Sequence, residues 1–247
     1  MKNSLKLLAA LAIGSAAATL IAQQTAPAPA PAPPIAPRQV QRLNDFGDLH
    51  RYASANATLA PMEKGRVVFF GDSITDAWTA NGGTFFPGKP YVNRGISGQT
   101  TPQMLVRFRQ DVLDLQPEAV VILAGTNDIA GNTGPSTLEM IEDNLTSMAE
   151  LAQANHIHVI LASVLPVADY PWRKGLEPAP KIKALNDWMQ SYCAEEKFTY
   201  LDYYTPMATP EGGMKDGISK DGVHPNAAGY AIMEPLAQKA IDTAMHK

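Results

Sequence analysis

The sequence predicts an α/β fold: a three-layer α/β/α sandwich around a mostly parallel central sheet of about five strands. Three mainly apolar runs of strand length, at residues 66–70, 119–124 and 159–164, carry this prediction. They are apolar at consecutive positions rather than at alternate ones, which is typical of strands buried on both faces, as in a parallel sheet. Shorter strand-like runs at 90–93 and 199–202 bring the expected strands to five.

Segments with helical periodicity separate these strands. They cover residues 102–115, 136–154, 182–195 and 226–244. In the first three, large apolar side chains recur on one face, as in helices that pack against a sheet. Ser136 and Glu139 form a capping-box pattern, which predicts a helix start near residue 136. Because strands and helices alternate, the functional loops are expected at the carboxyl ends of the strands.

Composition limits the classes of function. The chain has 247 residues, of which 45% are hydrophobic, so it can bury a full core, and residues 38–247 are expected to form one domain. The net charge of -4 is spread along the chain, which leaves no basic stripe for nucleic acid and no polybasic patch for a membrane surface. No zinc-binding motif occurs, so neither a metal nor a cofactor is expected.

The N-terminus has the layout of an export signal. Lys2 and Lys6 precede an apolar stretch at 7–21, so residues 1–22 are expected to be a signal peptide, with a retained anchor as the alternative. Residues 23–37 alternate Ala and Pro and are expected to form a disordered spacer. The only cysteine, Cys193, rules out an internal disulfide. The expected location is the periplasm or the exterior, with no membrane span once the signal is cleaved.

Two short segments carry the chemistry. Ser73 directly follows the first apolar run, and Asp221 precedes His224 by three residues across a glycine-containing turn. A serine hydroxyl needs a general base within reach, and that base needs a partner that fixes its tautomer. Asp221 and His224 can supply both from one loop. The alternative is that they only form a turn before Pro225, which caps a helix.

Four blocks in this order resemble the SGNH hydrolases, also called the GDSL esterase/lipase family. The blocks are Gly71-Asp-Ser-Ile-Thr75, Asn93-Arg-Gly-Ile-Ser-Gly98, Gly125-Thr-Asn-Asp128 and Asp221-Gly-Val-His-Pro225, and they span about 155 residues. The resemblance implies a flavodoxin-like sheet and a carboxylic ester hydrolase that forms an acyl-enzyme. The first block has Ile74 where the name-giving motif has leucine, a change that does not touch the chemistry.

The resemblance also implies roles for individual residues. Ser73 would be the nucleophile, His224 the general base and Asp221 the orienting carboxylate. The oxyanion hole would consist of the N–H groups of Ser73 and Gly95 with the side-chain amide of Asn127. Among the other acids, Asp72 and Asp128 are expected to be structural, and Asp202 and Asp216 are weaker candidates for the orienting acid.

The substrate is less well defined by the sequence. Aromatic residues near the expected site could line a pocket, with core packing or loop anchoring as the alternative: Trp78, Phe85, Tyr170 and Trp172. The leading hypothesis is an exported esterase for short acyl groups, foremost acetyl, on carbohydrates or small molecules. A lysophospholipase, a thioesterase or an esterase like platelet-activating-factor acetylhydrolase is the alternative. A non-catalytic envelope-binding module is a third reading, and the oligomeric state stays open.

Overall fold

The computed structural model describes residues 44–60 and 63–246. The expected signal peptide at 1–22 and spacer at 23–37 lie outside these residues. Five strands form the sheet: β1 (Val67–Gly71), β2 (Tyr91–Gly95), β3 (Ala119–Leu123), β4 (His158–Ala162) and β5 (Thr199–Leu201). The long helices are α4 (Thr101–Asp111), α6 (Leu138–Ala154), α7 (Pro178–Glu196) and α9 (Ala227–Met245). Shorter elements are α2 (Ala53–Ala57), α3 (Ser73–Asp76), η1 (Leu113–Leu115), α5 (Thr126–Ile129) and α8 (Tyr204–Met207).

The sheet is parallel throughout, with strand order β2-β1-β3-β4-β5. This confirms the predicted fold class, and the order is that of flavodoxin-like proteins. In the register, Gly71 at the end of β1 pairs with Gly95 of β2 on one side and with Leu123 of β3 on the other. Three chain segments therefore leave the sheet at the same level, next to one another.

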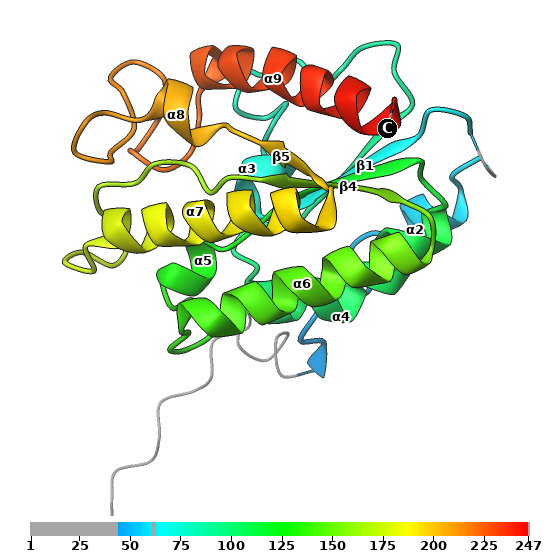
Figure 1. The fold of residues 1–247 in the computed structure, drawn as a ribbon, viewed down its shortest axis with the longest axis horizontal. Coiled ribbons are helices and arrows are strands. Elements are labelled where there is room, and N and C mark those ends of the chain that lie inside the picture. The colour runs from blue at the N-terminus through cyan, green and yellow to red at the C-terminus, as the bar shows by residue number, and fades with distance from the viewer. Residues whose placement is uncertain (1–43, 61–62, 247) are drawn as a thin grey trace, which may run out of the picture. The chain divides into compact units, whose positions relative to one another are not determined.

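Alternate residues of each strand point into two separate cores. Val68 and Phe70 pack with α4, α6 and α7, whereas Val67 and Phe69 face the core that α9 covers. Figure 1 shows the same layers, with α9 on one face of the sheet and α4, α6 and α7 on the other. Because both faces are covered, a strand gains from being apolar at every position, which explains the continuous apolar runs.

Some helix starts differ from the sequence prediction. The N-cap of α6 is Thr137, whose hydroxyl accepts the N–H of Met140, so the cap lies one residue after the predicted Ser136. Helix α7 starts at Pro178 instead of residue 182. Proline is compatible with the first turn of a helix, where the N–H groups have no intrahelical acceptor. Helix α9 starts one residue after the predicted position, at Ala227, because Asn226 is its N-cap and its side chain accepts the N–H groups of Ala228 and Gly229.

Within residues 44–60 and 63–246, no helix is long and apolar enough to cross a membrane.

Candidate active site

The candidate site lies where the carboxyl ends of β1, β2 and β3 meet the loop before α9. Ser73 is the first residue of α3, directly after β1, and Asn127 belongs to α5, directly after β3. His224 lies in the loop that precedes α9. Residues separated by up to 151 positions along the chain thus meet at one edge of the sheet.

Ser73, His224 and Asp221 form a continuous hydrogen-bonded chain. The Ser73 Oγ lies 2.9 Å from His224 Nε2, and His224 Nδ1 lies 2.8 Å from Asp221 Oδ2. The contacts are those expected from the sequence, while neither of the weaker candidate acids contacts His224: Asp202, for example, accepts the N–H of Thr205. The arrangement can move a proton from a serine hydroxyl to an imidazole.

Backbone hydrogen bonds hold the carboxylate in place. Asp221 Oδ1 accepts the N–H groups of Val223 and His224, at 3.0 and 2.8 Å. Burial alone would raise the pKa of Asp221, but hydrogen bonds from the backbone and ring of His224 and from Val223 outweigh it and lower that pKa. The carboxylate is therefore ionised at neutral pH, as an acceptor for a ring N–H must be.

Ser219 is a site residue that the sequence reasoning missed. Its Oγ accepts the N–H groups of Asp221 and Gly222 and donates to the carbonyl of His224. These three hydrogen bonds hold the loop that carries Asp221 and His224. A serine two residues before an Asp-Gly turn is a signal for such a side-chain turn, although it is a common one.

Asp72 and Asp128 lie buried beneath the site and bind protein groups, as expected of structural residues. Asp72 accepts the N–H of Ile74 at 2.9 Å and the Asn127 Nδ2 at 3.2 Å. Asp128 accepts both the N–H and the hydroxyl of Thr101. Burial raises the pKa of Asp72 to about 7 and that of Asp128 to about 6.

The structure does not place Gly95 where an oxyanion donor is needed. The N–H of Gly95 donates to Asn93 Oδ1 at 2.9 Å, and its Cα packs so closely on α3 that an added Cβ would lie 2.1 Å from the Asp76 nitrogen. Gly98, three residues later, lines the cleft beside Ser73 and has a φ of +80°, which favours glycine. Both glycines belong to the same motif, so spacing alone could not separate them.

Asn127 lines the same cleft and is held rigidly. Its Nδ2 donates to the Gln99 carbonyl at 2.9 Å and to Asp72, and its Oδ1 accepts from Asn132 at 2.8 Å. The amide is thus fixed from three sides, and both of its N–H groups donate to protein acceptors.

The cleft at the site has a volume of about 590 Å³, and polar and apolar surface share its walls about equally. Trp172, 46% exposed, lies on one side with its ring centroid 6.0 Å from that of His224. Lys220 also lines the cleft and hydrogen-bonds to Asn81. Small or polar residues supply the remainder of the wall: Ala77, Ser97, Gly98, Asn127 and Asn132.

The other three aromatic candidates do not line this cleft. Trp78 is 1% exposed and packs in the α9 core with Phe69 and Tyr230, and Phe85 packs against the same core. Tyr170 is fully buried, and its hydroxyl binds the carbonyl of Thr126. Core packing and loop anchoring, the alternative for these aromatics, therefore describe all but Trp172.

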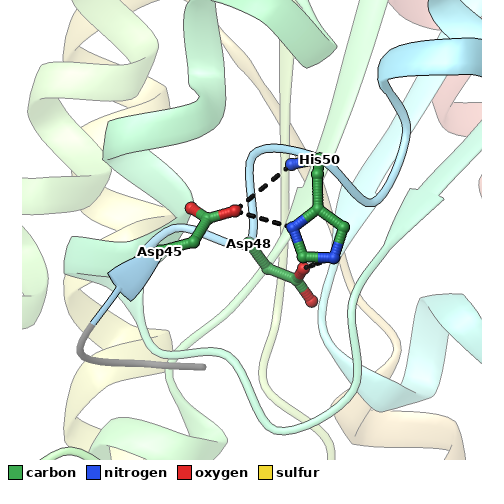
Figure 2. Close-up of side chains that lie close together, drawn as sticks. All are labelled: Asp45, Asp48 and His50. Atoms are coloured by element: carbon green, nitrogen blue, oxygen red, sulfur yellow. Dashed lines mark hydrogen bonds and ion pairs between the residues drawn. The ribbon is translucent and has the colours of Figure 1, made fainter. Parts of the chain in front are cut away.

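One group among the described residues has the ligand types and spacing for a metal ion. Asp45, Asp48 and His50 have ligand atoms within 4.8 Å of one another. Figure 2 shows that the carboxylates flank the imidazole: His50 Nδ1 lies 2.8 Å from Asp45 and Nε2 lies 3.4 Å from Asp48. The hydrogen bond to Asp45 and the charge of Asp48 raise the pKa of His50. They thereby favour the protonated ring, whereas a metal needs a free ring nitrogen.

Fold and site together define the class: an α/β protein whose serine, histidine and aspartate are arranged as in serine hydrolases. The sequence pattern of the GDSL-like lipase/acylhydrolase family matches residues 69–232. The chain belongs to this family, which confirms the resemblance seen in the sequence.

Solved structures agree with this assignment. A GDSL-like lipase from Bacteroides thetaiotaomicron is 47% identical with a TM-score of 0.78, over 81% of this chain and 99% of that chain. A Bacteroides fragilis protein described as an acylhydrolase is 45% identical with a TM-score of 0.79, over the same shares of the two chains.

Curated relatives match over shorter stretches. Esterase TesA from Pseudomonas aeruginosa is 29% identical over 56% of this chain and 62% of its own length. A Bacillus subtilis lipoprotein, YqeF, is 35% identical over 32% of this chain and 33% of its own length. The chain thus spans less than two thirds of either curated relative. The family and the esterase relative support a carboxylic ester hydrolase.

Proposed function

We propose that this protein is an exported serine esterase that removes short acyl groups, foremost acetyl, from polar substrates such as carbohydrates. The observation that carries the proposal is the hydrogen-bonded chain from Ser73 through His224 to Asp221 in the wall of an open cleft. An activated serine at the mouth of a cleft is what ester hydrolysis by an acyl-enzyme requires.

The proposed reaction has two halves. Ser73 Oγ attacks the ester carbonyl carbon while its proton passes to His224 Nε2, and Asp221 stabilises the imidazolium. The tetrahedral intermediate collapses, the bond to the alcohol oxygen breaks, and His224 gives its proton to that oxygen. Water then attacks the acyl-enzyme, losing a proton to His224, and the acid leaves as the proton returns to Ser73.

The oxyanion hole would consist of the N–H groups of Ser73 and Gly98 with the Asn127 amide. Ser73 is the first residue of α3, where an N–H group has no intrahelical acceptor. Gly98 replaces the Gly95 of the sequence expectation because only Gly98 lies at the cleft. An oxyanion would take over one of the hydrogen bonds that Asn127 Nδ2 now donates to Gln99 and Asp72.

The cleft walls support a polar substrate. Amides, hydroxyls and Lys220 surround Ser73, and Trp172 offers the one large aromatic surface among the lining residues. Such a wall suits a sugar ring, which stacks on an aromatic face while its hydroxyls bind polar groups. A long acyl chain would instead need an apolar channel, and the aromatic residues that could build one, Trp78 and Phe85, are in the core. A lipid esterase or thioesterase therefore stands second.

Export is proposed from the N-terminal pattern of charge followed by apolar residues at 1–22. The lipoprotein relative from Bacillus subtilis supports a location outside the cytoplasm.

The test is the initial rate of hydrolysis of p-nitrophenyl acetate, butyrate, octanoate and palmitate by the protein and by Ser73→Ala. We expect the highest rate on acetate and its loss in the variant. A rate that peaks at octanoate or longer would favour the lipid alternative. No Ser73-dependent rate, and no labelling of Ser73 by a fluorophosphonate, would favour the binding module.

A further inference from the structure

Arg107 is a fully buried arginine on α4, beneath the loops that carry Ser73 and Gly98. Its Nη2 donates to the Gly71 carbonyl at 3.0 Å, and its Nη1 donates to the Arg94 carbonyl at 2.9 Å. Gly71 is the last residue of β1 and Arg94 the last but one of β2, so both carbonyls lie at the carboxyl ends of these strands. One side chain therefore joins the exits of two neighbouring strands.

The same guanidinium reaches a third segment. Its Nε donates to Gln99 Oε1 at 2.5 Å, and Gln99 directly follows Gly98. The Gln99 carbonyl in turn accepts the Asn127 Nδ2 at 2.9 Å. Hydrogen bonds thus link Arg107 to Gly71, two residues before Ser73, to Gln99, next to Gly98, and through Gln99 to Asn127.

The environment keeps this guanidinium charged and fixed. Burial lowers its pKa to about 10, so it stays protonated at neutral pH, and Asp111 balances the charge at 3.1 Å. The ring of Phe70 lies 4.1 Å from the guanidinium carbon. A planar fork with several donors can hold acceptors in fixed relative positions, which a lysine ammonium on a flexible stem cannot do.

We propose that Arg107 is a positioning residue of the active site. It sets the distance between Ser73 and the oxyanion donors by holding Gly71, Arg94 and Gln99 on one rigid group. This inference rests on the proposed function. Arg107 does not line the cleft, so its replacement should slow the chemical step rather than weaken substrate binding.

The chain offers a matched control in Arg66, which is also buried, at 2% exposure. Arg66 precedes β1 at the opposite edge of the sheet and donates to the carbonyls of Leu115 and Ala60. Its loss removes a buried guanidinium and its hydrogen bonds to two backbone carbonyls, as loss of Arg107 does. Arg66, however, lies at the opposite end of β1 from Ser73.

The experiment compares Arg107→Lys, Arg107→Met and Arg66→Met. For each variant one measures the melting temperature, kcat and KM on p-nitrophenyl acetate, and the rate constant for labelling of Ser73 by a fluorophosphonate. We expect Arg107→Met to lower kcat and the labelling rate by about 10- to 100-fold, as a misplaced catalytic group does, with KM changed less than about 2-fold. Arg107→Lys should fall between this variant and the unaltered protein. Arg66→Met should melt earlier but keep its kcat and labelling rate while folded.

Each other outcome has a defined meaning. If the unaltered protein shows no Ser73-dependent labelling, the proposed function fails before Arg107 is judged. If it labels, and folded Arg107 variants label at the same rate, the positioning role is overturned. It is equally overturned if Arg107→Lys cannot fold, or if Arg66→Met loses kcat to the same extent as Arg107→Met, because the effect would then be one of stability alone.

Discussion

The two tryptophans that the sequence suggested as pocket walls have opposite environments, and truncating each should separate stability from activity. Trp78 is 1% exposed and surrounded by aromatic rings, the nearest being Tyr230 at 4.8 Å between centroids. Its Nε1 donates to the Thr84 carbonyl at 3.1 Å. Replacing a buried tryptophan by alanine costs about 3–5 kcal/mol because it removes apolar contacts and leaves a cavity.

This loss can be converted into a melting temperature. For a domain of this size, 1 kcal/mol corresponds to roughly 2–4 °C, so Trp78→Ala should melt about 6–20 °C earlier. KM should not change, because Trp78 lies in the core under α9 and is not a wall of the cleft.

Trp172→Ala is the matched variant. The ring is 46% exposed and contacts Tyr170 and His224 on the cleft wall. Removing an exposed side chain usually changes stability by less than about 0.5 kcal/mol. A lost aromatic stacking contact of about 0.5–1.5 kcal/mol corresponds to a 2- to 12-fold fall in kcat/KM on an acetylated sugar.

The assay is thermal unfolding followed by circular dichroism, with kinetics at a temperature where both variants are folded. The reasoning is refuted if Trp78→Ala melts like the unaltered protein but raises KM. It is also refuted if Trp172→Ala leaves kcat/KM on every acetylated sugar unchanged.

Three further predictions concern the buried polar groups and the acid of the site. Burial raises the pKa of Asp72 to about 7, above its unfolded value, so its stability contribution is full below about pH 4 and is lost as pH rises to 7. Between pH 5 and pH 8 this loss amounts to about 3 kcal/mol, and Asp72→Asn should remove it, seen as a smaller difference between the urea midpoints at the two pH values; equal differences in both proteins would contradict this. Asp221→Asn should lower kcat on the order of 10³- to 10⁴-fold, while Asp216→Asn, in the same segment, should not; the reverse would identify the rival acid. Tyr170→Phe should cost about 0.5–1.5 kcal/mol, because the hydroxyl's hydrogen bond to the Thr126 carbonyl is lost while the Ala130 N–H still donates to that carbonyl; an unchanged urea midpoint would argue against the bond.

The strands and the acid–base pair could be predicted because their signals are local. Continuous apolar runs report burial on both faces, and all five predicted strands are present, shifted by one or two residues at their ends. Asp221 and His224 lie three residues apart, so backbone bonds within one turn already bring carboxylate and ring together. The N-cap of α6 was misplaced by one residue because Ser136 and Thr137 are both good caps.

Three features depend on tertiary packing: which of Gly95 and Gly98 lines the cleft, the burial of Trp78 and the exposure of Trp172. Each depends on which surface of a loop faces α3, α9 or the cleft, and no periodicity or spacing within the loop records that. Arg107 illustrates the same limit, because its acceptors lie 36, 13 and 8 residues away in sequence. The layers and the candidate reacting groups could be read from the sequence, because burial patterns and short-range turns depend on residues that are close together in the chain. Only the packing of α4 and α9 on the sheet decided which neighbouring side chains support those groups, because contacts between distant segments depend on the positions of all of them at once.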